Sequence, residues 1–188
     1  MRILVGITGA SGALYATNFI KHASRLGHEI HVIPSSTGIF ILKHELGMDI
    51  DELKKYCKTL YSNDDLTAPP SSGTSGYEAM VIVPCTLSTM CKVSQGIGDN
   101  LICRAATVML KEQRKLVLVV RDTPLSTVHI RCMLGLAEAG AVVLPASPAF
   151  YHKPHNINDL ADYISAKIFD VLGIKHDIGI HWEDKKSF

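Results

Sequence analysis

Ala79-Met80-Val81-Ile82-Val83 is an unbroken apolar run that stops at Pro84 and is followed by the polar turn Cys85-Thr86-Leu87-Ser88-Thr89. A second run, Leu116-Val117-Leu118-Val119-Val120, ends in the charged pair Arg121-Asp122. Short, continuous, β-branched runs are typical of parallel strands that helices cover on both faces. Ligands of such sheets bind outside the carboxyl ends of the strands, so we expect functional side chains in these two turns.

Strand and helix patterns alternate along the rest of the chain. Further strands are predicted at 2–8, 28–33 and 141–144, and helices at about 13–26, 39–45, 49–57, 87–93, 101–114, 124–139 and 157–172. Five alternations predict an α/β fold: a three-layer α/β/α, Rossmann- or flavodoxin-like doubly wound domain with a mainly parallel sheet. The length of 188 residues fits a single domain that spans residues 1–188.

Charge and composition exclude several classes of partner. With 19 basic and 18 acidic residues the net charge is +1, which gives no field for nucleic acid or an anionic membrane. The apolar runs are too short to cross a bilayer, and Met1-Arg2-Ile3-Leu4-Val5 begins a strand rather than a signal peptide, so we expect a cytoplasmic protein. The five cysteines form no C-x-x-C pair and are read as free buried thiols, with a nucleophilic Cys85 as the alternative.

A glycine-containing turn, Gly9-Ala10-Ser11-Gly12, joins the first strand to the first helix. Such a turn lets backbone N–H groups and the helix N-terminus face an anion or a polar ring edge. It lacks the full G-x-G-x-x-G fingerprint, and no acidic residue ends the second strand, so nicotinamide dinucleotide binding is disfavoured. A tight turn needed only for packing remains the alternative.

Other polar side chains are predicted at the same edge of the sheet. Pro34-Ser35-Ser36-Thr37 follows the second strand, and Glu45 ends the next helical segment, where a solvated surface carboxylate is the alternative. The Pro- and Gly-rich stretch 67–76 is expected to form a loop or lid over the strand ends. With Arg121, Lys111 and Lys167 available for a phosphate, these residues predict a pocket for a phosphorylated, partly aromatic ligand.

Several motifs occur in a fixed order along nearly the whole chain. They are Gly6-Ile7-Thr8-Gly9-Ala10-Ser11-Gly12-Ala13, Pro84-Cys85, Asn100-Leu101-Ile102-Cys103-Arg104-Ala105-Ala106, Leu110-Lys111-Glu112, Val120-Arg121-Asp122-Thr123-Pro124 and Pro148-Ala149-Phe150-Tyr151-His152-Lys153-Pro154. Together they resemble the UbiX-type flavin prenyltransferases (UbiX/PAD1) of the homo-oligomeric flavin-containing superfamily.

The resemblance implies a concrete reaction. Enzymes of this family join the dimethylallyl group of dimethylallyl phosphate to N5 and then C6 of reduced FMN, without a metal, and release phosphate. The product, prenylated FMN, serves UbiD-type decarboxylases. The family also implies a homo-oligomer, commonly a dodecamer, in which the tail 175–188 with Trp182 reaches a neighbouring subunit.

The resemblance also assigns roles to residues of this chain. Flavin contacts are implied for Gly9, Ala10, Ser11, Ser35, Thr86, Leu87, Ser88, Thr89 and Arg121. Lys111, Arg121, Tyr151 and Lys167 would hold the donor phosphate, because cations stabilise the charge of a departing phosphate. Ser11, Glu45 and Asp122 would move protons at N5 and C6.

Two positions depart from some relatives. Lys167 stands where those relatives have arginine, so bidentate geometry would be lost, and Leu66 stands where they have tryptophan. Three other functions remain open at this stage: an FMN-binding accessory subunit of an aromatic acid decarboxylase without its own catalysis, a flavin-dependent cysteine decarboxylase, and a plain nucleotide-binding module. The second usually carries a histidine after the first helix and a Met-Asn clamp, and neither is found in this chain.

Overall fold

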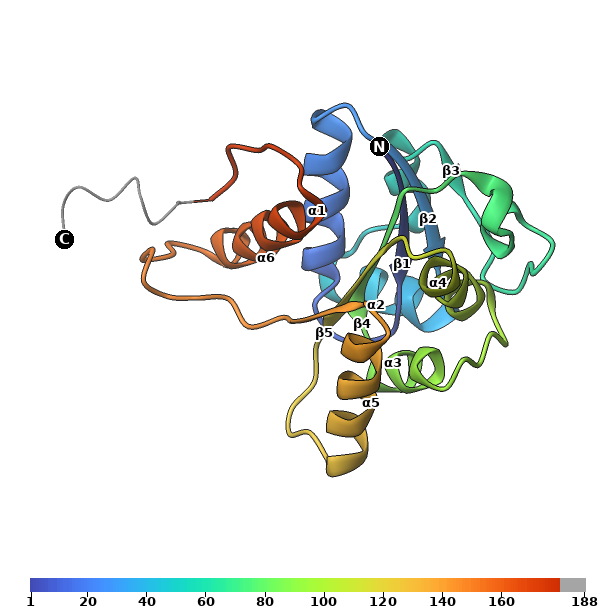
Figure 1. Cartoon of the computed structure of the whole chain (residues 1–188). Coiled ribbons are helices and arrows are strands. Elements are labelled where there is room, and N and C mark those ends of the chain that lie inside the picture. Colours follow the sequence, from blue (N-terminus) through green and yellow to red (C-terminus); the bar gives the residue numbers. More distant parts are fainter. Residues whose placement is uncertain (180–188) are drawn as a thin grey trace.

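The computed structural model describes residues 1–179, in which six strands form one parallel sheet (Figure 1). The order across the sheet is β3-β2-β1-β4-β5-β6, and every neighbouring pair is parallel. The strands are β1 (Arg2–Ile7), β2 (Glu29–Pro34), β3 (Thr59–Leu60), β4 (Ala79–Cys85), β5 (Lys115–Val120) and β6 (Val142–Pro145). The order reverses at β1, since β2 follows on one side and β4 on the other.

Helices cover both faces of the sheet (Figure 1). One layer contains α1 (Ala13–Arg25), α2 (Ser36–Leu46) and α6 (Ile157–Leu172), and the other contains α3 (Leu87–Ser94), α4 (Leu101–Lys111) and α5 (Thr127–Glu138). The prediction of a three-layer, doubly wound α/β/α fold is confirmed. No helix within residues 1–179 is both long and apolar enough to span a bilayer.

The two hydrophobic cores explain the apolar runs in the sequence. Successive side chains of a strand point to opposite faces, so Ile3, Val5 and Ile7 of β1 enter the core beneath α1 and α6. Leu4 of the same strand enters the core beneath α3, α4 and α5. Because helices cover both faces of the sheet, β1, β4 and β5 carry no polar side chain between their ends.

Some boundaries differ from those expected. The two-residue strand β3 was not predicted, and the segment predicted as a helix at 49–57 is a 3-10 helix, Ile50–Lys55, that Asp49 caps. Helix α5 begins at Thr127 rather than near 124, because the Ser126 side chain accepts a hydrogen bond from the N–H of His129 and caps the helix there.

The segment that we expected over the strand ends lies along α4 instead. Near the start of α4, the Asn63 side chain accepts a hydrogen bond from the N–H of Ile102, at 3.0 Å. Farther along, Arg104 Nε donates to the Ser71 carbonyl, and beyond the end of the helix Arg114 donates to the Gly73 carbonyl. The stretch 67–76 is therefore attached to α4 along the helix and does not form a lid over the carboxyl edge.

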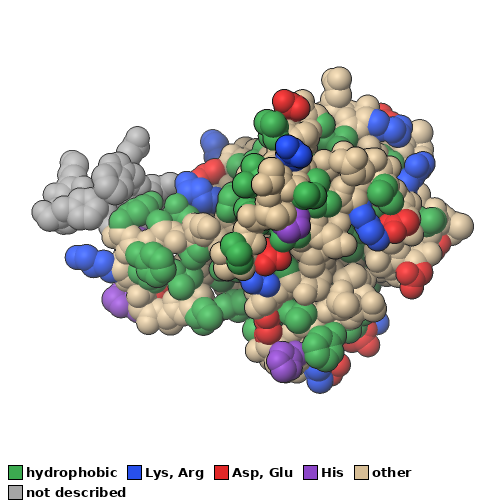
Figure 2. Space-filling model, turned by 90° about the horizontal axis from the view of Figure 1, so that it is seen from below, with side chains coloured by type: hydrophobic (Ala, Val, Ile, Leu, Met, Phe, Trp, Pro, Cys, Tyr) green, Lys and Arg blue, Asp and Glu red, His purple; other side chains and the backbone are tan. Residues whose placement is uncertain are grey.

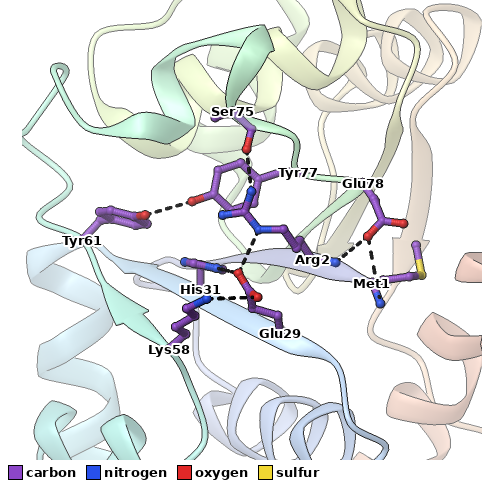
Figure 3. A network of polar contacts seen from close by, with 9 residues as sticks. All are labelled: Met1, Arg2, Glu29, His31, Lys58, Tyr61, Ser75, Tyr77 and Glu78. Carbon is purple, nitrogen blue, oxygen red and sulfur yellow. Dashed lines mark hydrogen bonds and ion pairs between the residues drawn. The ribbon is translucent and has the colours of Figure 1, made fainter.

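A polar network holds the same segment to the amino ends of β1 and β2 (Figure 3). Arg2 donates to the Glu29 carboxylate at 2.8 Å and to the Ser75 carbonyl at 2.6 Å, and its guanidinium lies over the ring of Tyr77. His31 contributes a second hydrogen bond to Glu29, at 2.8 Å. Hydrogen bonds from His31, Arg2 and Lys58 lower the pKa of Glu29 to about 2.

Candidate active site

The loops that follow four strands meet at the carboxyl edge of the sheet. Backbone hydrogen bonds join neighbouring loops there: Ser35 N–H donates to the Ile7 carbonyl at 2.9 Å, and Arg121 N–H donates to the Cys85 carbonyl at 3.3 Å. The glycine turn after β1, the hydroxyls after β2 and β4, and Arg121 after β5 therefore share one edge, as the sequence predicts. Figure 2 looks onto this edge.

Two glycines give the first turn its shape. Gly12 has φ 109° and ψ 35°, and an added Cβ would lie 2.7 Å from Cδ2 of Tyr15. At Gly9 an added Cβ would lie 2.5 Å from the hydroxyl oxygen of Thr37. The backbone of the turn thus closely approaches both the first turn of α1 and the start of α2, which a larger residue would prevent.

The carboxylate of Glu45 occupies the N-terminus of α1. It accepts hydrogen bonds from the N–H groups of Gly12, at 2.9 Å, and Ala13, at 2.8 Å. Burial alone would raise the pKa of Glu45, but hydrogen bonds from the Ser11 side chain and these N–H groups, with the charge of Arg121, lower it overall. Glu45 is therefore an ionised carboxylate at neutral pH, beside the glycine turn.

Arg121 lies across the cleft from Glu45. Its Nε donates to the carbonyl oxygen of Ser11 at 2.9 Å. Both residues line a cleft of about 790 Å³ together with Ser11, Gly12, Leu14, Tyr15, His44, Leu46, Ile157, Asn158, Leu160 and Ala161. The cleft combines an anion, a cation and a hydroxyl with apolar walls from α1 and α6, which suits a ligand that is part ring and part phosphate.

Two helices begin at the same edge with hydroxyl caps. Ser35 Oγ accepts from the N–H of Gly38 at the start of α2, and Thr86 Oγ1 accepts from the N–H of Thr89 at the start of α3. Uncompensated N–H groups at such helix starts attract anions. Leu87 and Ser88 lie in the first turn of α3, so the predicted flavin residues 86–89 form the start of this helix.

Asp122 is exposed next to Arg121. Its carboxylate accepts a hydrogen bond from the N–H of Thr123 at 2.8 Å, and it is not among the described residues that line the cleft with Glu45. Within the chain, Asp122 thus lies beside the cleft rather than in it.

Lys111 lies at the opposite edge of the sheet from Arg121. It ends α4, four residues before β5 begins, whereas Arg121 follows the end of β5. A strand of six residues spans roughly 20 Å. Lys111 pairs instead with the carboxylate of its neighbour, Glu112. One copy of the chain therefore cannot bring Lys111 and Arg121 to the same phosphate.

Tyr151 and Lys167 form a third group, near β6 and α6. The ring of Tyr163 lies between them, 6.4 Å from that of Tyr151 and 5.8 Å from Nζ of Lys167. Nζ of Lys167 also pairs with Asp170 at 3.0 Å. The four predicted phosphate residues are thus divided among three places on one chain, and all except the half-buried Arg121 are exposed.

Three of the five cysteines, Cys85, Cys103 and Cys132, are buried as predicted, whereas Cys57 and Cys91 are half-buried. All five cysteines are unpaired, and burial raises the pKa of Cys85, which makes this thiol a poor nucleophile. Within residues 1–179, no group of three or more His, Cys, Asp or Glu side chains is arranged to hold a metal ion. Trp182 lies outside the described residues.

Comparisons with known proteins agree with this geometry. A family model described as Flavoprotein matches residues 1–170. The flavin prenyltransferase UbiX of Saccharolobus solfataricus is 41% identical in an alignment of 185 positions that covers 97% of this chain and 92% of that protein. The chain belongs to the UbiX family of flavin prenyltransferases. The family resemblance found in the sequence motifs is thereby confirmed.

Two solved structures resemble this UbiX-family chain over nearly their whole length. The crystal structure of AnUbiX (PadA1) in complex with FMN and dimethylallyl pyrophosphate has a TM-score of 0.94 at 37% identity and covers 96% of each chain. A dodecameric FMN-dependent UbiX-like decarboxylase from Escherichia coli O157:H7 has a TM-score of 0.94 at 32% identity and covers 97% of this chain and 99% of that chain.

Sequence reasoning did not single out several side chains of this UbiX-family site. Tyr15 and His44 line the cleft, and Thr8 joins two of the loops. Thr8 belongs to the first motif, but the sequence predicts no role for it. Its buried hydroxyl, like the half-buried ring of Tyr15, acquires a role only through contacts with residues far along the chain, which no local pattern reveals.

Proposed function

We propose that this chain transfers the dimethylallyl group of dimethylallyl phosphate to N5 and C6 of reduced FMN and so makes prenylated FMN. The observation that carries the proposal is the meeting of Ser11, Glu45 and Arg121 in one cleft at the carboxyl edge of the sheet. The starts of α2 and α3 lie along the same edge and offer N–H groups for the FMN phosphate.

The first step breaks the C–O bond of the donor and forms a C–N bond at N5. Phosphate leaves with the electron pair of the C–O bond, and N5 loses its proton. Ring closure then forms a C–C bond at C6, adds a proton to the prenyl double bond and removes the proton of C6. We assign the proton-accepting role to Glu45, because its lowered pKa keeps it ionised, with Ser11 as a relay and Asp122 as a further proton-transfer group.

Donor phosphate binding uses Arg121 from one copy of the chain and, in our proposal, Lys111, Tyr151 and Lys167 from neighbouring copies. The division of these four residues among three places supports this arrangement. Exposed apolar side chains support it too: Phe150 is 71% exposed and Ile157 68%, and apolar side chains gather on this part of the carboxyl-edge face (Figure 2). A dodecamer like that of the E. coli relative would cover them.

The reaction is tested by mixing the purified protein with reduced FMN and dimethylallyl phosphate without oxygen and measuring the mass of the flavin. A gain of one prenyl unit and release of phosphate are expected. Tight binding of FMN with no change in mass would instead identify a flavin carrier without catalysis.

Assembly of the site from different copies is tested by complementation. Lys111→Ala and Arg121→Ala are each expected to be inactive. In oligomers refolded from equal amounts of the two variants, half of the copies carry an intact Lys111 and the other half an intact Arg121. A site that takes one residue from each of two copies should therefore be complete in about a quarter of cases. No recovery in mixed oligomers would mean that both residues act from the same copy.

The product is proposed to serve a UbiD-type decarboxylase. Adding this protein, reduced FMN and donor to such a decarboxylase that lacks its cofactor should activate it, and FMN alone should not. The unpaired cysteines fit a reducing compartment such as the cytoplasm, where we place the reaction. We treat residues 1–188 as one flavoprotein domain.

A further inference from the structure

Thr8 is buried at the point where the order of the strands reverses. It is the first residue after β1, and its side chain is 3% exposed. The pairing of β1 with β4 ends at Gly6 and Ile82, although β4 continues to Cys85. Beyond Gly6, another contact must therefore hold the two strand ends together.

The hydroxyl of Thr8 makes two hydrogen bonds to the end of β4. It donates to the carbonyl oxygen of Pro84 at 2.7 Å and accepts from the N–H of Thr86 at 2.9 Å. The N–H of Thr8 also donates to the Pro84 carbonyl, at 3.3 Å. Among the described residues, the Thr8 hydroxyl is the partner that the structure gives to the N–H of Thr86.

The residues on either side of this link belong to the flavin site. Thr86 caps α3 by accepting from the N–H of Thr89. Gly9 directly follows Thr8 and lies against Thr37 near the start of α2. The buried hydroxyl of Thr8 thus fixes the start of α3 relative to the glycine turn. The glycine turn also lies against the start of α2.

We propose that Thr8 is a positioning residue of the flavin site: its hydroxyl sets the distance between the glycine turn 9–12 and the turn 86–89, and thereby the affinity for FMN. Thr8 does not touch the flavin in this proposal, which rests on the proposed function for the identity of the ligand. The role is assigned to the hydroxyl of Thr8 and not to its methyl group.

Thr8→Val is the sharpest variant, because valine keeps the shape and volume and removes only the hydroxyl. The change removes the acceptor of the part-buried N–H of Thr86, so the start of α3 has to move to find a new acceptor. Thr8→Ser keeps both hydrogen bonds and removes only the methyl group.

Thr17→Val is the matched control. Thr17 is also a buried threonine, 1% exposed, in the same βα unit, but its hydroxyl donates only to the carbonyl of Leu14 within its own helix. Both valine variants should lower the melting temperature by a few degrees. Only Thr8→Val should move the two turns relative to each other.

The test measures the Kd of each variant for FMN by fluorescence, together with its visible absorption spectrum, its melting temperature and its KM for dimethylallyl phosphate. Thr8→Val should raise the Kd for FMN about tenfold or more and alter the spectrum of the bound flavin, with the KM for the donor within twofold of wild type. Thr8→Ser and Thr17→Val should bind FMN within twofold of wild type.

Equal FMN affinity in Thr8→Val and wild type, or equal losses in Thr8→Val and Thr17→Val, would overturn the proposal. If Thr8→Val does not fold, Thr8→Ser and Thr8→Ala decide in its place: only the serine variant should keep the affinity. A wild-type protein that binds FMN but transfers no prenyl group would contradict the proposed reaction and leave the role of Thr8 in binding intact.

Discussion

Nε of Arg121 donates a hydrogen bond to the carbonyl oxygen of Ser11, which lies 110 residues earlier in the chain, at 2.9 Å. The bond holds the guanidinium against the glycine turn, and Arg121 also lines the cleft. The loops after β1 and β5 are not adjacent in the sheet, because β4 lies between those strands. This one contact therefore links the loops after β1 and β5 across the end of β4.

Arg121→Lys keeps the positive charge but removes the Nε–H that holds the side chain to Ser11. We expect kcat/KM for dimethylallyl phosphate to fall about tenfold or more, since a hydrogen bond to a charged group contributes about 1.5–3 kcal/mol. Steady-state phosphate release measures the effect. Arg131→Lys, at an exposed position of α5, is the control and should be neutral. Equal rates in Arg121→Lys and wild type would show that only the charge matters.

Glu45→Gln removes the proton acceptor but retains an oxygen that can accept from the N–H of Ala13. The single-turnover rate of flavin alkylation should fall at least about 100-fold, the lower end of what general acid–base catalysis contributes.

The pH dependence of the stability of Glu45→Gln gives a second readout. Because the pKa of Glu45 is below its ordinary value of 4.5, its contribution to stability is complete above pH 4.5 and is lost as the pH falls through the lowered pKa. Melting temperatures measured from pH 7 to pH 3 should therefore converge between wild type and Glu45→Gln at the acid end.

Gly12→Ala and Gly27→Ala separate backbone strain from a steric clash. Both glycines have positive φ, 109° and 81°, so each alanine should cost about 1–2 kcal/mol of unfolding free energy. Nothing lies within 4 Å of an added Cβ at Gly27, whereas at Gly12 the ring of Tyr15 would be displaced. Urea denaturation should show the larger loss for Gly12→Ala, and only this variant should bind FMN more weakly. Wild-type affinity in Gly12→Ala would mean that the ring of Tyr15 moves without effect on the flavin site.

Glu29→Gln tests the network at the amino edge (Figure 3). The carboxylate of Glu29 receives hydrogen bonds from His31, Arg2 and Lys58, which lower its pKa to about 2. A lowered pKa stabilises the fold above pH 4.5, and this stabilisation is lost as the pH falls from 4.5 towards 2. The variant should melt at a lower temperature than wild type at pH 7, and the difference should shrink at pH 3. Glu138→Gln, an exposed position at the end of α5, should melt like wild type at both pH values.

The sequence was most informative where burial leaves no choice of residue. Because β4 and β5 are covered on both faces, they appear as unbroken apolar runs that predict a parallel sheet. The ends of these runs also located the turns with Thr86 and Arg121, which the structure places at the carboxyl edge as predicted. By contrast, the strand Thr59–Leu60 is too short to show any periodicity, so its place at the edge of the sheet was not predictable.

The positions of side chains along helices were harder to infer. The motif around Lys111 predicts a phosphate ligand, but the end of α4 places this residue at the amino edge of β5, at the opposite end of that strand from Arg121. The stretch 67–76 was predicted to be a loop from its composition alone. Its attachment to α4 depends on Arg104 and Arg114, whose partners are backbone carbonyls that carry no sequence signal.

The carboxylate at the start of α1 has one more consequence. In dinucleotide-binding βαβ units the pyrophosphate occupies that helix start, where N–H groups and the helix dipole attract negative charge. Here Glu45 already satisfies the N–H groups of Gly12 and Ala13. A pyrophosphate brought to the same place would meet a like charge and N–H groups that already have an acceptor, so this helix start disfavours the binding mode of dinucleotide cofactors.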